Sequence, residues 1–467
     1  MPTAWTSLLL QPFTSLSLPN LRMPAVSRLR CPQTVCRISS TTSPPPSDAS
    51  AVYIHLPFCR RRCHYCDFPI IALGSSSHHH DDDPRIFSYI RLLLREIHAT
   101  RSSSAHHPPI KTIFFGGGTP SLVPPRLVAS VLDAIRSKFG EIDADAEVSM
   151  EMDPGTFDAA RLEEMVGVVG VTRVSLGVQA FQAELLRACG RAHGRREVDD
   201  AIETVAGCHG VKSWSLDLIS SLPNQTENMW EESLRLAVSA GPHHVSVYDL
   251  QVEKGTKFEQ LYTPGEFPLP TEAQSADFYK TASETLRKAG YDHYEISSYC
   301  KPGHECLHNL TYWQNRPFYA FGLGAASYLA GVRFSRPRRP AVYEKYVEAL
   351  EAGSCTGGEH SGDAELAMDE VMLSLRTARG LDVERFGRAF GESLVVSLCR
   401  EWRPYVKSGH VVAMDEERGE LSIGEFEVET NRGRGEGRRV AFIRLSDPEG
   451  FLMSNELIAV AFRVLAP

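Results

Sequence analysis

The sequence predicts an α/β fold, a partial (β/α)6 TIM-like barrel followed by a smaller α+β domain. Short β-like runs alternate with amphipathic helical stretches from residue 48 to residue 300, and this alternation is typical of parallel sheets. Polar or glycine-rich residues recur where the runs end, which is where a β/α barrel carries its active site. From residue 301 to 467 the pattern changes to helices and hairpin-like pieces. We therefore divide the chain into segments 1–47, 48–300 and 301–467.

Residues 1–47 differ in composition from everything that follows. They contain no Asp or Glu, only four arginines as charged side chains, and many Ser, Thr, Pro and Leu residues. An acid-poor, hydroxyl-rich N-terminus with arginines is typical of an organelle transit peptide. The scarcity of arginine favours a chloroplast over a mitochondrion as the destination. A disordered tail is the alternative interpretation.

The composition of the whole chain excludes several classes of protein. The 467 residues carry 49 basic and 58 acidic side chains, a net charge of −9, which does not suggest a nucleic-acid-binding protein. No apolar run is long enough to span a membrane. The eleven cysteines are widely spaced except for one group of three, which is not the pattern of a disulfide-stabilised domain.

Six β-like runs and two strongly amphipathic helices define the expected barrel. The helices are expected over residues 85–97, with Ile86, Ile90, Leu93, Leu94 and Ile97 on one stripe, and over residues 126–139. The strands are expected over residues 51–56, 111–115, 147–152, 172–178, 214–219 and 244–250.

The C-terminal segment is expected to form a separate, smaller fold. Residues 364–376 and 383–391 have helical patterns, and residues 439–458 are expected to form a strand, a turn and a closing helix. This order of elements predicts an α+β domain of a winged-helix-like kind.

Three cysteines follow the first expected strand in the run "PFCRRRCHYCDF". Cys59, Cys63 and Cys66 are spaced C-x3-C-x2-C, and cysteine thiolate is the usual protein ligand of iron–sulfur clusters. Each thiolate can take one iron of a [4Fe–4S] cluster, which leaves the fourth iron open to a small molecule. A zinc site with His55 or His64 as the fourth ligand is the alternative.

The cysteine spacing resembles the hallmark of the radical S-adenosylmethionine (SAM) enzymes. The resemblance implies that the open iron binds the amino and carboxylate groups of SAM, with the cofactor supplying the difficult chemistry. The run "FFGGGTP", one strand later, is similar to the family's segment that meets the methionine amino group. Its glycines allow the backbone to approach a ligand closely.

Longer motifs resemble one branch, the oxygen-independent coproporphyrinogen III dehydrogenases and their haem-chaperone relatives. "TIFFGGGTPSLV", "EMDPGT", "RVSLGVQAF", "SLDLISSLPNQT" and "LRTARGLD" occur in the order of that branch. The resemblance implies that Tyr53, Tyr65, Gly117, Gly118 and Thr119 surround SAM, and that Glu151, Gln179, Arg191, Asp217 and, less securely, Gln251 line the barrel mouth. For Glu151 and Arg191, the alternative to this role is an ordinary ion pair or a capping role.

Two features favour the haem chaperones over the dehydrogenases. The dehydrogenases usually have a fourth cysteine two residues after the third, and Phe68 stands there in this chain. The run "HNLTYW" (308–313) resembles the chaperones' H-N-x-x-Y-W motif, which implies that His308 faces haem. Imidazole is a common axial ligand of haem iron. A buried core or helix-capping histidine is the alternative.

These resemblances imply a radical SAM-type protein that binds haem as cargo and transfers it to an apo-haemoprotein acceptor. A [4Fe–4S] cluster, SAM and an electron donor to the cluster are the implied cofactors and partner, and no residue is assigned a catalytic role. Coproporphyrinogen III dehydrogenase activity is the first alternative. A non-catalytic zinc-stabilised binding protein is the second.

Overall fold

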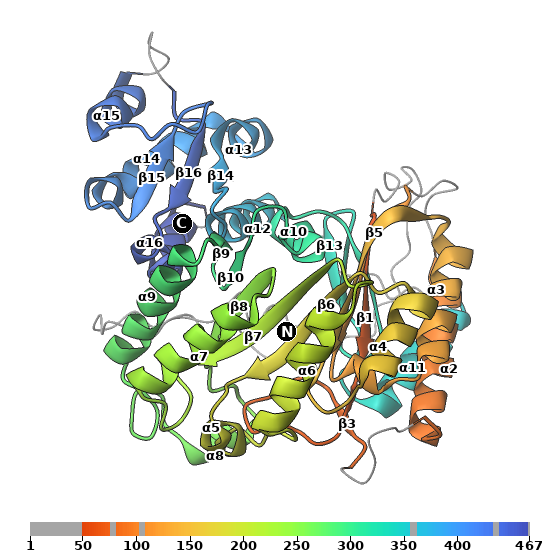
Figure 1. Ribbon diagram of the computed structural model, residues 1–467. Coiled ribbons are helices and arrows are strands. Elements are labelled where there is room, and N and C mark those ends of the chain that lie inside the picture. Colours follow the sequence, from red (N-terminus) through yellow and green to blue (C-terminus); the bar gives the residue numbers. More distant parts are fainter. Residues whose placement is uncertain (1–48, 75–80, 102–107, 355–361, 433–438, 466–467) are drawn as a thin grey trace.

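A single large sheet forms the centre of the computed structural model, which describes residues 49–74, 81–101, 108–354, 362–432 and 439–465 (Figure 1). The expected transit peptide lies outside these residues. The sheet has nine strands in the order β11-β1-β4-β5-β6-β7-β8-β10-β9, parallel from β11 to β8 and antiparallel beyond. The strands are β1 (Ala51–Leu56), β4 (Ile110–Gly117), β5 (Ile142–Met152), β6 (Arg173–Gln179), β7 (Ser213–Ser220), β8 (His244–Asp249), β9 (Asp292–Glu295), β10 (Ser298–Cys300) and β11 (Tyr319–Phe321).

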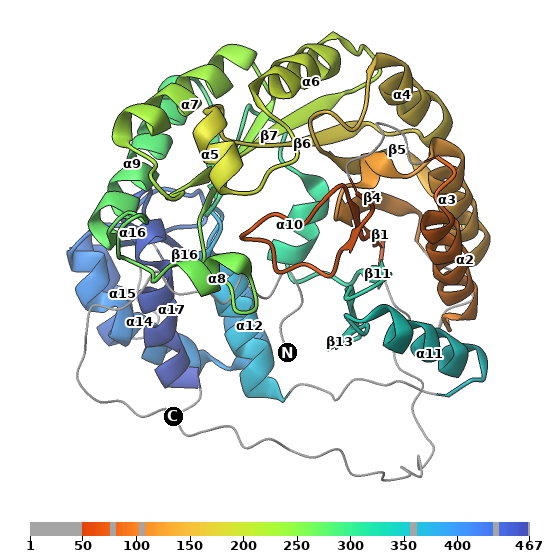
Figure 2. The same cartoon turned by 90° about the horizontal axis from the view of Figure 1, so that it is seen from below.

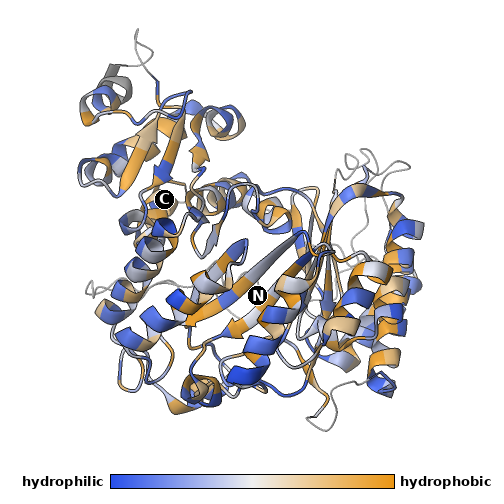
Figure 3. Ribbon diagram, in the orientation of Figure 1, coloured by the Kyte–Doolittle hydropathy of each residue, from blue (hydrophilic) through white to orange (hydrophobic). Residues whose placement is uncertain are grey.

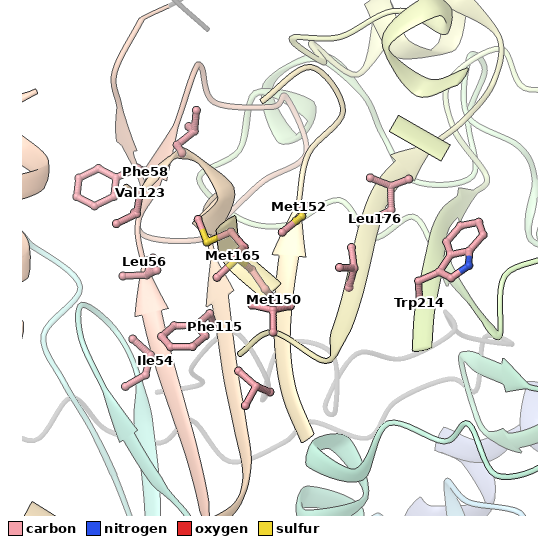
Figure 4. Close-up of a cluster of buried hydrophobic side chains, with 14 of the residues drawn as sticks. Ile54, Leu56, Phe58, Phe115, Val123, Met150, Met152, Met165, Leu176 and Trp214 are labelled. Carbon is pink, nitrogen blue, oxygen red and sulfur yellow. The ribbon is translucent and has the colours of Figure 1, made fainter. Parts of the chain in front are cut away.

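All six expected strands are present in the parallel part of the sheet, which confirms the predicted α/β class. Side chains of β1 alternate between its two faces, as the two-residue period of a strand requires. Ile54 and Leu56 join the core on one face, beside Phe115 and Met150 of the neighbouring strands (Figure 4). On the opposite face, Tyr53 belongs to a smaller cluster that lies inside the curved sheet.

Helices cover the outer face of the sheet in an arc (Figure 2). Polar residues lie on their outer surfaces and hydrophobic residues face the strands (Figure 3). The predicted stripe of the first helix is confirmed, with four of its members buried and Leu94 half-buried; Asp83 caps that helix by accepting from the Arg85 N–H. The helices of the arc are α2 (Pro84–Ala99), α3 (Pro125–Phe139), α4 (Ala159–Glu164), α6 (Arg195–Gly207), α7 (Glu227–Ala240) and α9 (Glu272–Lys288).

The main sheet extends beyond residue 300, where the sequence pattern predicts the end of the barrel. β11 pairs in parallel with β1, and a short hairpin of β12 (Ala326–Leu329) and β13 (Val332–Ser335) follows it. Helix α11 (Pro340–Glu351) then packs beside α2. The other strands were predicted because strands and helices alternate along the chain. The short apolar run of β11 is not part of a βα unit, so this alternation does not predict it.

Helix α10 (Leu307–Trp313) packs on the inner side of the sheet (Figure 2). The Phe114 ring of β4 lies 5.3 Å from the His308 ring of this helix, centroid to centroid. The motif "HNLTYW" therefore lies within the barrel.

The remainder of the chain forms an α+β unit with its own core, which we call the C-terminal unit. Its antiparallel sheet has the order β14-β16-β15. The two helices and the strand–turn–helix expected from the sequence are all present in it. The unit comprises α12 (Asp363–Leu375), β14 (Leu381–Asp382), α13 (Val383–Phe390), α14 (Glu392–Lys407), β15 (Val411–Met414), α15 (Ile423–Arg432), β16 (Phe442–Leu445), α16 (Glu449–Leu452) and α17 (Ser454–Leu465).

None of the helices in the described part of the chain combines the length and apolar character needed to cross a bilayer.

Candidate functional site

One cavity of about 370 Å³ opens inside the curved sheet and reaches the C-terminal unit. The strands of a parallel sheet end at the same edge, so side chains that follow them meet there. With the exception of His308, every site residue expected from the sequence lines this cavity: Tyr53, Cys59, Cys63, Tyr65, Cys66, Gly117, Gly118, Thr119, Glu151, Gln179, Arg191 and Asp217, together with Phe68 and Gln251.

The cysteine loop leaves the end of β1 and is closed by a two-residue parallel ladder. β2 (Phe58–Cys59) pairs with β3 (Ile71–Ala72). Within the loop, Arg62 donates from Nη1 to the carbonyl oxygens of Cys66, at 3.0 Å, and of Phe68, at 2.8 Å. The three thiols are partly exposed and none forms a disulfide. They therefore remain available to a ligand in the cavity.

The glycine-rich turn after β4 holds the first cysteine from the other side. The N–H of Gly118 donates to the Leu56 carbonyl at 2.9 Å, and the N–H of Thr119 donates to the Phe58 carbonyl at 2.6 Å. A Cβ atom at Gly118 would lie 2.6 Å from the Phe58 carbonyl oxygen, so only glycine permits this approach. Thr119 Oγ1 also donates to Cys59 Sγ at 3.6 Å.

Arg191 links the cysteine loop to the sheet. Its guanidinium donates to Cys63 Sγ at 3.3 Å, to the Tyr65 hydroxyl at 3.1 Å and to the Gly177 carbonyl at 2.8 Å, and it forms an ion pair with Asp153. Burial alone would raise the pKa of Asp153, but the charge of Arg191 and a nearby histidine lower it to about 2. Arg191 therefore holds an ion pair and contacts the thiol loop at the same time.

Asp153 was not among the residues singled out from the sequence. It lies in "EMDPGT", two residues after Glu151, and that quoted motif was the available signal. A carboxylate that follows a strand directly is also expected at the mouth of a β/α barrel.

Glu151 is a partly buried carboxylate that faces the glycine turn. Its Oε2 accepts from the Gly117 N–H at 2.8 Å. Burial and the nearby Asp217 raise the pKa of Glu151 to about 7, against the opposing effect of that N–H. Glu151 therefore makes a capping hydrogen bond, which is the alternative role expected from the sequence, and it also lines the cavity.

The remaining predicted residues lie along the neighbouring strand ends. Asp217 accepts from Ser175 Oγ at 2.7 Å and from Ser215 Oγ at 3.0 Å. Gln179 has a φ of 69°, a backbone conformation that is uncommon for residues other than glycine, at the end of β6. Gln251 donates to Asp249 Oδ2 at 3.2 Å.

His308 is fully buried beside the cavity. Its Nδ1 lies 2.8 Å from Thr112 Oγ1 and its Nε2 lies 2.7 Å from the Tyr312 hydroxyl. Burial lowers the pKa of His308 to about 3, so the ring is neutral. An iron atom at either nitrogen would replace one of these hydrogen bonds. Asn309, the next residue of α10, is the member of the motif that lines the cavity.

Both histidines considered as zinc ligands have partners on their ring nitrogens. His55 contacts the Tyr53 hydroxyl at 3.2 Å and the Pro69 carbonyl at 3.0 Å. His64 contacts the Ala188 carbonyl at 2.9 Å and Lys257 Nζ at 3.1 Å. Across the described ranges, no three His, Cys, Asp or Glu side chains converge on a position for a single metal ion. In a [4Fe–4S] cluster each thiolate binds a different iron, so the three thiols fit that group without such convergence.

The pKa of Glu151 predicts how the stability of the cofactor-free protein varies with pH. When folding raises the pKa of a glutamate, the residue contributes stability that is complete below the unfolded-state pKa, about 4.3. For Glu151 this contribution is lost as the pH rises through the folded-state pKa, about 7. Glu151→Gln lacks this titrating group. We therefore expect its free energy of unfolding, measured with urea, to rise relative to that of the wild type by about 3 kcal/mol as the pH goes from about 4.5 to 8. Parallel pH curves for the two proteins would contradict the raised pKa.

Comparison with known proteins defines the class to which this fold and loop belong. A model of the radical SAM superfamily matches residues 53–237. The Escherichia coli coproporphyrinogen III oxidase HemN, a radical SAM enzyme, has the same fold, with a TM-score of 0.70, 18% identity, and coverage of 90% of this chain and 91% of that chain. The protein is a member of the radical SAM superfamily.

Sequence relatives define the family more narrowly. The heme chaperone HemW of Synechocystis sp. is 39% identical over 424 residues, which cover 89% of this chain and 97% of that protein. A bovine protein named radical S-adenosyl methionine domain-containing protein 1, mitochondrial, is 34% identical over 284 residues, 60% of this chain and 61% of that protein. The chain belongs to the HemW family of heme chaperones.

Proposed function

We propose that this protein is a haem chaperone, which binds haem and transfers it to apo-haemoproteins, on a scaffold that carries a [4Fe–4S] cluster and SAM. The observation that carries the proposal is the 39% identity to the Synechocystis heme chaperone over 424 residues, which cover 89% of this chain and 97% of that protein. The cavity agrees with a flat, largely apolar cargo, because Tyr53, Phe114 and Ile70 line it.

Phe68 supports the chaperone over the dehydrogenase. It lines the cavity at the position where the dehydrogenases usually have a fourth cysteine. A phenyl ring supplies apolar contact area and offers no ligand to a metal. Coproporphyrinogen III dehydrogenase activity remains the alternative, because the E. coli enzyme shares the fold.

The three thiols on one loop suit a cluster with an open iron. We assign Cys59, Cys63 and Cys66 as its ligands, and Tyr53, Tyr65 and the turn of Gly117, Gly118 and Thr119 as the walls around SAM. Bound there, the cluster would supply the open iron that chelates SAM and an electron received from a donor protein. Glu151, Gln179, Arg191 and Asp217 are the polar groups available to the amino, carboxylate and ribose parts of SAM.

His308 is proposed to bind haem iron after it leaves its hydrogen bonds to Thr112 and Tyr312. A neutral imidazole is the form that binds iron, and burial keeps this ring neutral. We expect His308→Ala to lower haem affinity and to change the haem absorption spectrum relative to the wild type. Identical affinity and spectrum would remove His308 from the haem site.

One experiment separates the proposed function from its alternatives. Protein reconstituted anaerobically with iron and sulfide is titrated with haem and assayed in parallel for conversion of coproporphyrinogen III. Haem binding without conversion supports the chaperone, and transfer of the bound haem to an apo-haemoprotein completes the test. Conversion to protoporphyrinogen IX overturns it in favour of the dehydrogenase.

We propose an organellar location, with the chloroplast as the specific destination. The acid-poor residues 1–47 support an organelle, and the name of the bovine relative assigns that protein to mitochondria. A fluorescent reporter fused after residue 47 distinguishes the two destinations when it is expressed in plant cells.

A further inference from the structure

The end of the cavity that meets the C-terminal unit contains a buried arginine. Arg376 follows α12 directly, and its carbonyl accepts from the Ile296 N–H at 2.9 Å, which fixes it beside the β9–β10 edge of the main sheet. Its side chain lines the cavity although the residue is only 4% exposed. A cationic group this deeply buried requires compensation.

The Arg376 guanidinium is only partly satisfied within the described chain. Nη2 donates to Asn455 Oδ1 at 2.6 Å, whereas Nε and Nη1 are buried without a hydrogen-bond partner. Burial lowers the pKa of Arg376 to about 10, so the group is still charged at neutral pH. The buried Arg336, by comparison, has Glu96 as its counter-ion. No carboxylate of the described residues forms an ion pair with Arg376.

A second unsatisfied donor lies in the same part of the cavity wall. Ser454 is fully buried at the start of α17, next in sequence to Asn455, and its hydroxyl has no partner among the described residues. Ser454, Asn455 and Arg376 all line the cavity. Two adjacent segments of the C-terminal unit thus direct unsatisfied donors and one positive charge at the same cavity.

We propose that Arg376 and Ser454 form an anion-binding subsite that takes a carboxylate group of the ligand held in this cavity. A carboxylate accepts several hydrogen bonds and neutralises the guanidinium, so it satisfies both unsatisfied groups at once. The inference rests on the proposed function, because the carboxylate we assign is a propionate of the haem cargo. The subsite belongs to the C-terminal unit and the cysteine loop to the barrel, so the cargo would contact both.

Esterification of the propionates provides a direct test. The reconstituted full-length protein is titrated with haem and with haem dimethyl ester in the same mild detergent, because the ester keeps the iron and the ring but removes both negative charges. We expect the wild type to bind haem at least about tenfold more tightly than the ester, since hydrogen bonds to charged groups are the stronger class. Arg376→Met should lose most of that preference, and Ser454→Ala a smaller part of it.

Two further variants and a melting measurement exclude a merely structural effect. Arg376→Lys keeps the charge and should retain part of the preference for haem. Arg388→Met makes the same exchange on an exposed arginine of α13 in the same unit and should retain all of it. Without haem, Arg376→Met should melt no lower than the wild type, because it removes a buried charge that has no counter-ion within the described ranges of the chain.

The outcomes separate the subsite from the proposed function. If the wild type binds haem and its ester equally, or if Arg376→Met weakens both to the same extent, the carboxylate subsite is wrong and the chaperone function stands. If the wild type binds neither ligand, the proposed function fails and the subsite fails with it.

Discussion

Replacing Cys59 with serine is expected to leave the protein unable to hold its iron–sulfur cluster. A serine hydroxyl remains protonated at neutral pH and does not replace a thiolate as an iron ligand. With only three cysteines in the loop, the loss of one leaves two ligands for the cluster. After anaerobic reconstitution we expect about four iron atoms per wild-type chain and almost none in Cys59→Ser, together with loss of the brown absorbance.

Cys208→Ser is the matched control for this experiment. Cys208 is a partly buried free thiol at the end of α6, and it does not line the cavity. Its replacement should leave the iron and sulfide content unchanged. Full iron content in Cys59→Ser would show that the cluster is bound elsewhere. One zinc per wild-type chain in place of iron would support the zinc alternative.

The barrel strands could be predicted from the sequence because each is a local signal. In the run 51–56, His55 is the one residue that is not hydrophobic, and in the structure all six residues of β1 are buried. The strand β11 was not predicted, because three residues carry too little pattern and their place beside β1 depends on a contact between distant parts of the chain. Local periodicity indicates elements, whereas their order in the sheet requires long-range packing.

Most of the candidate site could be anticipated for a related reason. Strand ends and motif resemblance indicate Glu151, Gln179 and Asp217, and a parallel sheet brings strand ends together. Arg376 belongs to the motif "LRTARGLD", but this motif does not follow a strand of the barrel and indicates no role for the arginine. An arginine in a sequence is most often solvent-exposed, and only the structure places this one in a buried cavity wall with no counter-ion among the described residues.

The orientation of the His308 side chain could not be predicted from its motif. "HNLTYW" gives no indication of which side chains face the inside of the barrel, because that depends on how α10 is rotated against the sheet. In the structure Thr112 and Tyr312 hold both nitrogens of the His308 ring. A change of partners at this residue is therefore part of the proposed haem binding, which the sequence alone did not suggest.

A buried ion pair attaches the segment after residue 300 to the barrel. Glu96 of α2 and Arg336, which follows β13, are 2.7 Å apart between Oε1 and Nε, with side chains 0% and 2% exposed. Glu96 Oε2 accepts from the Gly322 N–H at 2.9 Å and from the Tyr343 hydroxyl at 2.5 Å. The carboxylate thus joins α2, the turn after β11, and α11.

Breaking this pair on one side is expected to cost about 3–5 kcal/mol of the free energy of unfolding. Arg336→Met leaves the Glu96 carboxylate buried without its counter-ion. Glu96→Gln likewise leaves the Arg336 guanidinium buried without its counter-ion. The double variant Glu96→Leu, Arg336→Met removes both charges, so its cost should be smaller than the sum of the two single costs. Urea unfolding of the cofactor-free proteins measures the free energy of unfolding of each variant.

Arg95→Met supplies the control from the adjacent position of α2. Arg95 pairs with Glu351 at 2.7 Å, but both side chains are substantially exposed, so its replacement should change stability little. If Arg336→Met proves as stable as Arg95→Met, the buried pair does not hold β11 against β1. Each pair has one member on α2 and the same ion-pair chemistry, so the expected contrast reflects the burial of the Glu96–Arg336 pair. The buried pair also explains how β11, which has no crossover helix of its own, stays paired with β1 at the edge of the barrel.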